Sequence, residues 1–205
     1  MRIGIFGGTF DPPHLGHLIP VEAAYAQFQL DQVWYVPAYI PPHKSREELA
    51  SPYHRTAMLA LMLQRYRNFY LSTFELDQGQ VIYTVQTVEE FGKSFAQPHQ
   101  LFLIMGADSF LELQTWRDYQ RLIQLSELII IDRGAKQAES RRHLEDLESI
   151  LQFDLTKTIH FAGTPEVPVS STDIRVAIRE GRGFGEMVSP EVAEYIRKHS
   201  IYQRR

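Results

Sequence analysis

Two histidines, His14 and His17, stand three residues apart near the start of the chain, shortly after the glycines Gly7 and Gly8. The run Ile3–Phe6 before the glycines is short and apolar, as buried parallel strands are, and a glycine exit exposes backbone N–H groups to a ligand. Histidines at this spacing lie on one face of a helix turn, where two imidazoles can donate to one oxygen that gains charge. The arrangement predicts a phosphate-handling site at the end of a strand.

The residues around the histidines predict the start of a helix. We expect Asp11 to be its N-cap, Pro12 or Pro13 its first residue, and the helix to begin near His14 with its positive dipole end towards the strand. Gly16 removes side-chain bulk between the imidazoles. A glycine pair alone, or one histidine near a helix start, is more often structural than catalytic. The full order of strand, double glycine, Asp-Pro and His-x-Gly-His favours a nucleotide site.

Two further segments carry cations that could meet phosphate. The prolines of Pro41-Pro42-His43-Lys44 stiffen a loop after a predicted strand, and we expect Lys44 to contact phosphate, with an ordinary rigid turn as the alternative. The hydroxyl residues of Ser170–Asp173 supply a helix N-cap, and Arg175 can present its forked guanidinium to phosphate oxygens. A simple cap would explain the hydroxyls, but the arginine favours a second anion site.

Two residues between these segments could recognise a nucleotide. Asp108, which follows a predicted strand and Gly106, could accept hydrogen bonds from ribose hydroxyls, with a helix N-cap as the equal alternative. Trp116 lies in a polar stretch where its indole could stack on a flat heteroaromatic ring, although tryptophan is usually buried in a core. The residues alone leave both alternatives open.

Strand-like and helix-like runs alternate along the chain, which predicts an α/β fold: a doubly wound, Rossmann-like parallel sheet with helices on both faces and a small C-terminal helical element. The expected strands are Ile3–Phe6, Gln32–Val36, Phe69–Thr73, Gln100–Met105, Glu127–Ile131 and Thr158–Phe161. The expected helices are His17–Phe28, Tyr53–Tyr66, Thr84–Ser94, Ala107–Leu113, Tyr119–Leu125, Arg142–Leu151, Ser171–Glu180 and Pro190–His199. Ligands of such folds bind at the carboxyl ends of the strands. We expect one domain over residues 1–205, with a C-terminal helical portion over about 171–205, and a polar, mobile surface element at Ala135–Glu148.

The composition excludes several classes of protein. Of 205 residues, 44% are hydrophobic and 22% charged, which argues against a disordered chain, and no apolar run approaches the ~18 residues of a membrane span. The start of the chain lacks a signal-peptide pattern, so we expect a cytoplasmic protein. The absence of cysteine excludes disulfides, thiolate metal sites and a cysteine nucleophile. A net charge of −4 gives no support for nucleic-acid binding, and the sequence predicts no oligomeric state.

The two outer motifs resemble those of a known superfamily. His-x-Gly-His at 14–17 and Ser-Ser-Thr-x-Ile-Arg at 170–175 resemble the nucleotidyltransferases that join a nucleotide to a phosphorylated acceptor. More narrowly, Tyr83-Thr84, Gly106-Ala107-Asp108 and Thr115-Trp116 resemble segments of the bacterial nicotinate-nucleotide adenylyltransferases, which make nicotinic acid adenine dinucleotide from ATP and nicotinate mononucleotide. The likeness extends over nearly the whole chain.

The resemblance implies an ATP site and an acceptor site. The residues implied for ATP are Gly7, Gly8, Thr9, Phe10, His14, His17, Gly106, Asp108, Ser171, Thr172 and Arg175. Those implied for nicotinate mononucleotide are Lys44, Thr84, Asp108, Trp116 and Arg133, and those implied for catalysis are His14, His17, Lys44 and Arg175. We expect Mg²⁺ to arrive with the ATP phosphates, since the sequence shows no carboxylate cluster for an all-protein metal site.

The chain departs from the family pattern on the acceptor side. Ala38 stands where the family often has Asn, Ile82 where Ser precedes Tyr-Thr, and Asp132-Arg133-Gly134 where Arg-Pro-Gly is frequent. These departures leave the ATP motifs intact. Three alternatives stay open: a phosphopantetheine adenylyltransferase or cytidylyltransferase, a nicotinamide-preferring adenylyltransferase, and a nucleotide-binding module without turnover.

Overall fold

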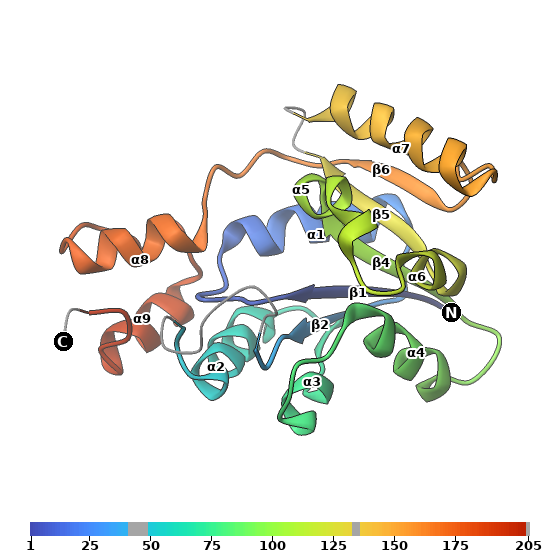
Figure 1. The fold of residues 1–205 in the computed structure, drawn as a ribbon. Helices are drawn as coiled ribbons and strands as arrows, with labels where there is room; N and C mark the ends of the chain where they lie inside the picture. Colours follow the sequence, from blue (N-terminus) through green and yellow to red (C-terminus); the bar gives the residue numbers. More distant parts are fainter. Residues whose placement is uncertain (41–48, 133–135, 204–205) are drawn as a thin grey trace. The chain divides into compact units, whose positions relative to one another are not determined.

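The computed structural model describes residues 1–40, 49–132 and 136–203, and Figure 1 shows the arrangement of the helices and strands. Within the described residues, six strands form one sheet in the order β3-β2-β1-β4-β5-β6. The strands are β1 (Arg2–Gly8), β2 (Gln32–Pro37), β3 (Phe69–Leu71), β4 (Gln100–Gly106), β5 (Glu127–Asp132) and β6 (Ile159–Gly163). β1 pairs with β4, β4 with β5 and β5 with β6, each in parallel, with Ile5 opposite Leu103 and Ile130 opposite Phe161. The predicted parallel α/β sheet is confirmed.

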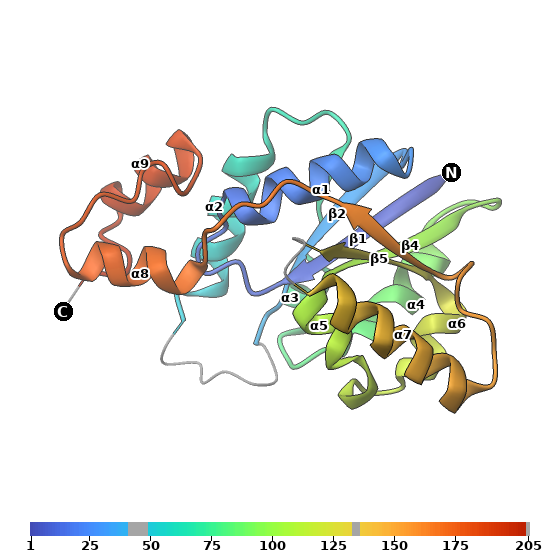
Figure 2. The ribbon, with the colours of Figure 1, turned by 90° about the horizontal axis from the view of Figure 1, so that it is seen from above.

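The central strands are covered on both faces. Ile3–Phe6 in β1 and Leu101–Met105 in β4 are buried without a break, which requires packing on both sides of the sheet. Figures 1 and 2 show the Pro20–Gln27 part of α1 (Leu15–Gln27) and α4 (Thr84–Ser94) on opposite sides of β1. Helices therefore cover both faces, as predicted.

Two helical segments differ from the sequence expectation. The other helices are α2 (Pro52–Leu63), α3 (Phe74–Gln78), α5 (Ala107–Leu111), α6 (Tyr119–Leu125), α7 (Gln137–Leu151), α8 (Ser171–Arg179) and α9 (Pro190–Lys198), with a 3-10 turn at Leu113–Thr115. α7 begins five residues before its predicted start. The residues of its first turns are polar, so they form helix without the apolar periodicity from which the start was predicted. α3 was not predicted; it has five residues and ends at Gly79, whose φ is 62°.

Contacts divide the chain into two compact units. The first comprises Met1–Gly7, Pro20–Trp34 and Tyr83–Glu166, and the second comprises Gly8–Ile19, Tyr35–Ile82 and Val167–Arg205. The first unit holds β4, β5 and β6, while the second holds the His14–His17 motif together with α2, α8 and α9. A single domain over residues 1–205 stays a prediction.

In the part of the chain that the structure describes, no helix combines the length and apolar character that a membrane crossing requires.

Candidate active site

Phe10 shapes the loop that follows β1. It has a positive φ of 51° and is buried, and its ring meets the ring of His17 edge-on with centroids 5.0 Å apart. A Cβ on Gly8 would lie 2.9 Å from the Phe10 ring, so glycine is needed for the ring to fold back against the chain. Left-handed backbone at a residue with a side chain costs about 1–3 kcal/mol and persists only where the surroundings hold it. Packing therefore fixes the shape of this loop.

The two imidazoles interlock at the start of α1. The rings of His14 and His17 stack with centroids 3.7 Å apart and an interplanar angle of 30°. Nδ1 of His14 accepts a hydrogen bond from the backbone N–H of Gly16 at 3.1 Å, and Nδ1 of His17 accepts one from the backbone N–H of His14 at 3.3 Å. The two side chains therefore stabilise the start of α1 together, because each ring accepts a hydrogen bond from a backbone N–H there.

These hydrogen bonds select the tautomer of each ring. A nitrogen that accepts a hydrogen bond from a backbone N–H carries no proton, so a neutral His14 or His17 holds its proton on Nε2. His14 is almost fully buried and His17 is half-buried, which restricts the motion of both rings. The pair therefore has two imidazole N–H groups on rings of defined orientation, and an imidazole N–H is the type of group that stabilises charge developing on a phosphate oxygen.

The prediction for Asp11 was wrong. α1 begins at Leu15, four residues after Asp11, so the Asp11 carboxylate is too far along the chain to cap the helix, and neither Pro12 nor Pro13 is its first residue. Asp11 is instead buried, and its Oδ1 accepts hydrogen bonds from the backbone N–H of Ala50 at 3.1 Å and the hydroxyl of Tyr202 at 2.7 Å. The capping role falls to His14.

α8 brings the last motif onto the first. Ser170 caps the helix as predicted, since its Oγ accepts from the backbone N–H of Asp173 at 3.1 Å. Ser171 Oγ donates to the carbonyl of Pro12 at 2.9 Å, and Nη1 of Arg175 donates to the carbonyl of Asp11 at 2.6 Å. A second amino group of Arg175 donates to Thr172 Oγ1 at 3.3 Å, and Thr172 is exposed. Arg175 thus stands beside the histidine loop, with its orientation fixed from two sides.

A buried arginine that the sequence reasoning missed supports the same loop. Arg55 in α2 is fully buried and donates to the carbonyls of Thr9 at 2.6 Å, Ala38 at 2.8 Å, Tyr39 at 2.9 Å and Ala50 at 3.2 Å. Burial lowers the pKa of Arg55, and the carboxylate of Asp11 opposes that shift. One guanidinium therefore fixes carbonyls from three separate stretches of chain. A charged residue on the apolar face of a predicted helix was the available signal.

The phenol of Tyr202 makes stability depend on alkaline pH. Burial, followed by the negative charge of Asp11, raises the pKa of Tyr202 above its ordinary 10.0. The protonated phenol is favoured by folding, so its contribution is fully present below about pH 10 and is lost as pH rises above that value, by about 1.4 kcal/mol per pH unit. Urea unfolding at a series of alkaline pH values should therefore show a steeper loss for the natural protein than for Tyr202→Phe. Equal slopes for the two proteins would contradict this assignment.

Thr84 and Trp116, two of the residues predicted for the acceptor, lie in the first unit, and the segments that carry them are in contact. Thr84 is the first residue of α4, and Trp116 directly follows the 3-10 turn. The guanidinium of Arg117 lies 4.7 Å from the centre of the Tyr83 ring, so the residues next to Thr84 and Trp116 are in contact. Trp116 is half-buried, which leaves part of its indole accessible and argues against the core alternative.

Asp108 lies at the carboxyl end of β4, where a ligand of a parallel sheet is expected. The N-cap of α5 is Gly106, so the cap alternative for Asp108 is excluded. The Asp108 side chain is exposed, and its carboxylate forms an ion pair with Lys136. Gly7, at the end of β1, is also exposed. The predicted roles of Lys44 and Arg133 concern residues outside those that the structure describes.

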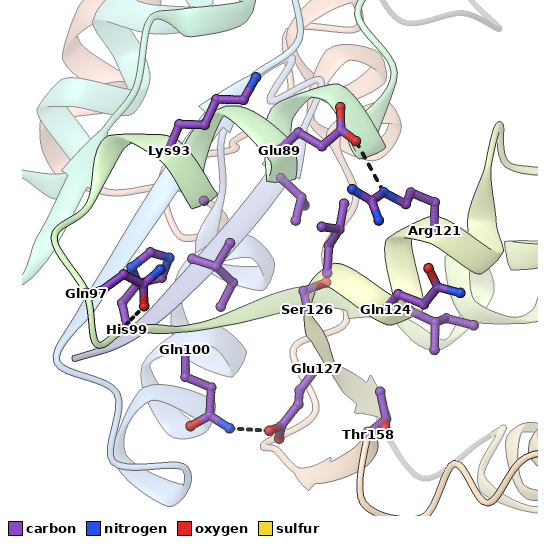
Figure 3. Close-up of a pocket in the computed structure, with 15 residues that line it drawn as sticks. Glu89, Lys93, Gln97, His99, Gln100, Arg121, Gln124, Ser126, Glu127 and Thr158 are labelled. Atoms are coloured by element: carbon purple, nitrogen blue, oxygen red, sulfur yellow. Dashed lines mark hydrogen bonds and ion pairs between the residues drawn. The ribbon is translucent and has the colours of Figure 1, made fainter.

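The first unit also has a cavity of about 700 Å³ at the opposite end of the strands (Figure 3). It lies against α4 and α6 and includes Gln100 and Glu127, the first residues of β4 and β5. Several of its polar groups bond to one another: Glu89 pairs with Arg121 at 3.4 Å, and the side-chain amide of Gln100 donates a hydrogen bond to Glu127. Because nucleotides bind at the carboxyl ends of parallel strands, this cavity is not the predicted nucleotide site.

The fold and motifs place the chain in a class of enzymes. Residues 5–177 match the cytidylyltransferase-like family, so the chain belongs to this family of nucleotidyltransferases. The chain is 36% identical over 204 residues to a probable nicotinate-nucleotide adenylyltransferase of Thermoanaerobacter sp. (strain X514), covering 100% of this chain and 95% of that relative. A protein of the same name from Moorella thermoacetica is also 36% identical, over 100% of this chain and 93% of its own length. Within the family, the chain belongs to the nicotinate-nucleotide adenylyltransferases.

Solved structures agree in fold. The nicotinic acid mononucleotide adenylyltransferase of Plasmodium falciparum complexed with APC has a TM-score of 0.73 at 17% identity, covering 98% of this chain and 96% of that one. A putative nicotinate-nucleotide adenylyltransferase from Vibrio parahaemolyticus has a TM-score of 0.67 at 21% identity, covering 98% and 94%. At these identities the likeness concerns the fold.

Proposed function

We propose that the protein transfers the adenylyl group of ATP to the 5′-phosphate of nicotinate mononucleotide, giving nicotinic acid adenine dinucleotide and pyrophosphate. The observation that carries the proposal is the stacked His14–His17 pair at the start of α1, with both rings oriented by backbone N–H groups. Arg175 stands beside the same loop. The names of the full-length relatives support the choice of acceptor.

The reaction is a direct displacement at the α-phosphorus of ATP. A phosphate oxygen of the acceptor forms the new bond while the bond to pyrophosphate breaks, and since that phosphate is already ionised at neutral pH, no general base or covalent enzyme intermediate is needed. Alignment of the two substrates can supply ~7–11 kcal/mol of the rate enhancement. His14 and His17 would donate to oxygens of the α- and β-phosphates, and Arg175 with Lys44 would stabilise the leaving pyrophosphate.

The remaining roles follow the resemblance. The backbone of Gly7–Phe10 would approach the phosphates of ATP, and Ser171 and Thr172 would bind adenine or the phosphates. Gly106 would belong to the same ATP site, and Asp108 would receive ribose. The acceptor residues would be Thr84 and Trp116 for the nicotinate ring, and Lys44 and Arg133 for the mononucleotide phosphate.

We expect Mg²⁺ to enter with ATP. Among the described residues, no group of three or more His, Asp and Glu side chains is arranged to hold a metal ion, so the triphosphate oxygens would supply its ligands. Bound in this way, the ion would neutralise charge on the departing pyrophosphate. A cytoplasmic location is part of the same proposal.

Release of pyrophosphate with three acceptors tests the proposal. Purified protein with ATP and Mg²⁺ should release pyrophosphate rapidly with nicotinate mononucleotide, and much more slowly with nicotinamide mononucleotide or phosphopantetheine. A preference for either of the other two would reassign the acceptor. Release with none of them would overturn the assignment of an enzyme to this chain.

A further inference from the structure

The C-terminal segment reaches the loop that carries the histidines. After α9 the chain passes through Ser200 and Tyr202, whose φ angles are 50° and 67°, and Ile201 between them is buried. Left-handed backbone at two residues with side chains persists where packing holds it. The hydroxyl of Tyr202 donates to Oδ1 of Asp11 at 2.7 Å. A residue outside every motif of the chain is therefore bonded to the middle of the first motif.

The two oxygens of Asp11 have different surroundings. Oδ1 receives two donors, the Tyr202 hydroxyl and the backbone N–H of Ala50. Oδ2 is buried, has no hydrogen bond among the described residues, and lies 3.7 Å from Nη1 of Arg175. Because two donors hold Oδ1, the carboxylate plane is fixed and Oδ2 faces the guanidinium.

The Asp11 carboxylate attracts Arg175 but does not itself accept a hydrogen bond from the guanidinium. At 3.7 Å the charges interact, yet the hydrogen bond of Nη1 goes to the backbone carbonyl of Asp11 at 2.6 Å. The carboxylate therefore orients the guanidinium electrostatically, while the fork is held by a carbonyl and by Thr172. Such a guanidinium keeps donor capacity for phosphate oxygens.

We propose that Tyr202 is a positioning residue for ATP binding: through Asp11 it sets the orientation of Arg175. The proposal rests on the proposed function, because it assumes that Arg175 meets the ATP phosphates. Without the hydroxyl, Oδ1 keeps one donor, and the carboxylate can rotate to form direct hydrogen bonds with Arg175. The guanidinium would then turn towards Asp11 and away from the triphosphate.

The test is Tyr202→Phe, which keeps the ring and removes one hydroxyl. We expect the KM for ATP to rise about tenfold, as for the loss of one oriented charge-assisted hydrogen bond. We also expect kcat to fall, because Arg175 acts on the leaving pyrophosphate as well, while the KM for nicotinate mononucleotide stays unchanged. The matched control is Tyr195→Phe, since the Tyr195 hydroxyl is bonded to His54 at 3.0 Å and does not reach Asp11. The control should keep the KM of the natural protein for both substrates.

A double-mutant cycle separates positioning from general support. If Tyr202 acts through Arg175, Tyr202→Phe should change the KM for ATP less than twofold in an Arg175→Gln background. The same tenfold rise in that background, or a lowered melting temperature with an unchanged KM, would overturn the positioning role. Binding of α,β-methylene-ATP, measured by calorimetry without any acceptor, keeps the two proposals apart. If the natural protein binds the analogue but transfers no adenylyl group, the proposed function fails; if it is active and Tyr202→Phe binds the analogue equally well, the role of Tyr202 fails.

Discussion

His17→Ala should turn over about 10²–10³ times more slowly than the natural protein, the loss seen when one donor to a developing oxyanion is removed. The lost Nε2–H acts on charge that grows in the transition state, so the KM values should change much less than kcat. The ring also accepts one hydrogen bond from the backbone of His14, so a modest fall in melting temperature is expected. Steady-state pyrophosphate release and a thermal melt measure the two effects separately.

His99→Ala is the matched control for this change. His99 is half-buried at the amino end of β4, and its ring contacts the carbonyl of Ala96 and the ring of Phe95. The control should retain normal turnover. Near-normal turnover of His17→Ala would remove His17 from the mechanism.

Gly16→Ala should lower kcat by about 10²-fold, although it adds a single methyl group to a helix. The added Cβ would lie 2.9 Å from both Cε1 and Nδ1 of His14 and 3.2 Å from the carbonyl oxygen of Val169. The carbonyl oxygen blocks movement to one side, so the His14 ring must shift and lose its hydrogen bond to the backbone of residue 16. A displaced imidazole no longer aligns with the reacting phosphate, and kinetics of the variant against its thermal stability would show this.

Gly92→Ala provides the control for an alanine placed in a helix. Gly92 lies in α4, and a Cβ there would meet only Leu101 Cδ1, at an ordinary 3.9 Å. It should keep full activity and gain about 0.5–1 kcal/mol of stability from the higher helix propensity of alanine. Equal activity of the Gly16 and Gly92 variants would show that the position of His14 does not govern the rate.

Local sequence signals predicted most of the fold. Each expected strand is present, because runs such as Ile3–Phe6 and Gln100–Met105 combine apolar residues with clear boundaries. The misses are segments whose structure is not marked by periodicity: α3 is a single short helix, and the first turns of α7 are polar. Such segments acquire their structure from the rest of the fold rather than from their own pattern.

In the candidate site too, features set by nearby residues were predicted, whereas features set by distant residues were not. The closeness of His14 and His17 was predicted from their spacing of three residues, although His14 directly precedes α1 rather than lying in its first turn. The role of Asp11 depends on partners that lie 39 and 191 positions away in the sequence. The role of Arg55 depends on carbonyl groups from three separate stretches of the chain. Asp-Pro before a helix resembles a cap, and nothing nearby in sequence shows that the carboxylate is buried against Tyr202. Residues with a local motif are therefore easier to identify from one sequence than the residues that hold the motif in place.

Adenylyl transfer is tested most directly by following the α-phosphorus of ATP. The natural protein is incubated with Mg²⁺, nicotinate mononucleotide and ATP labelled at the α-phosphate, and the products are separated. The label should enter nicotinic acid adenine dinucleotide in step with pyrophosphate release, and His17→Ala should form this product far more slowly. Label appearing in free AMP, or a dinucleotide yield independent of the acceptor, would contradict adenylyl transfer as the function of this chain.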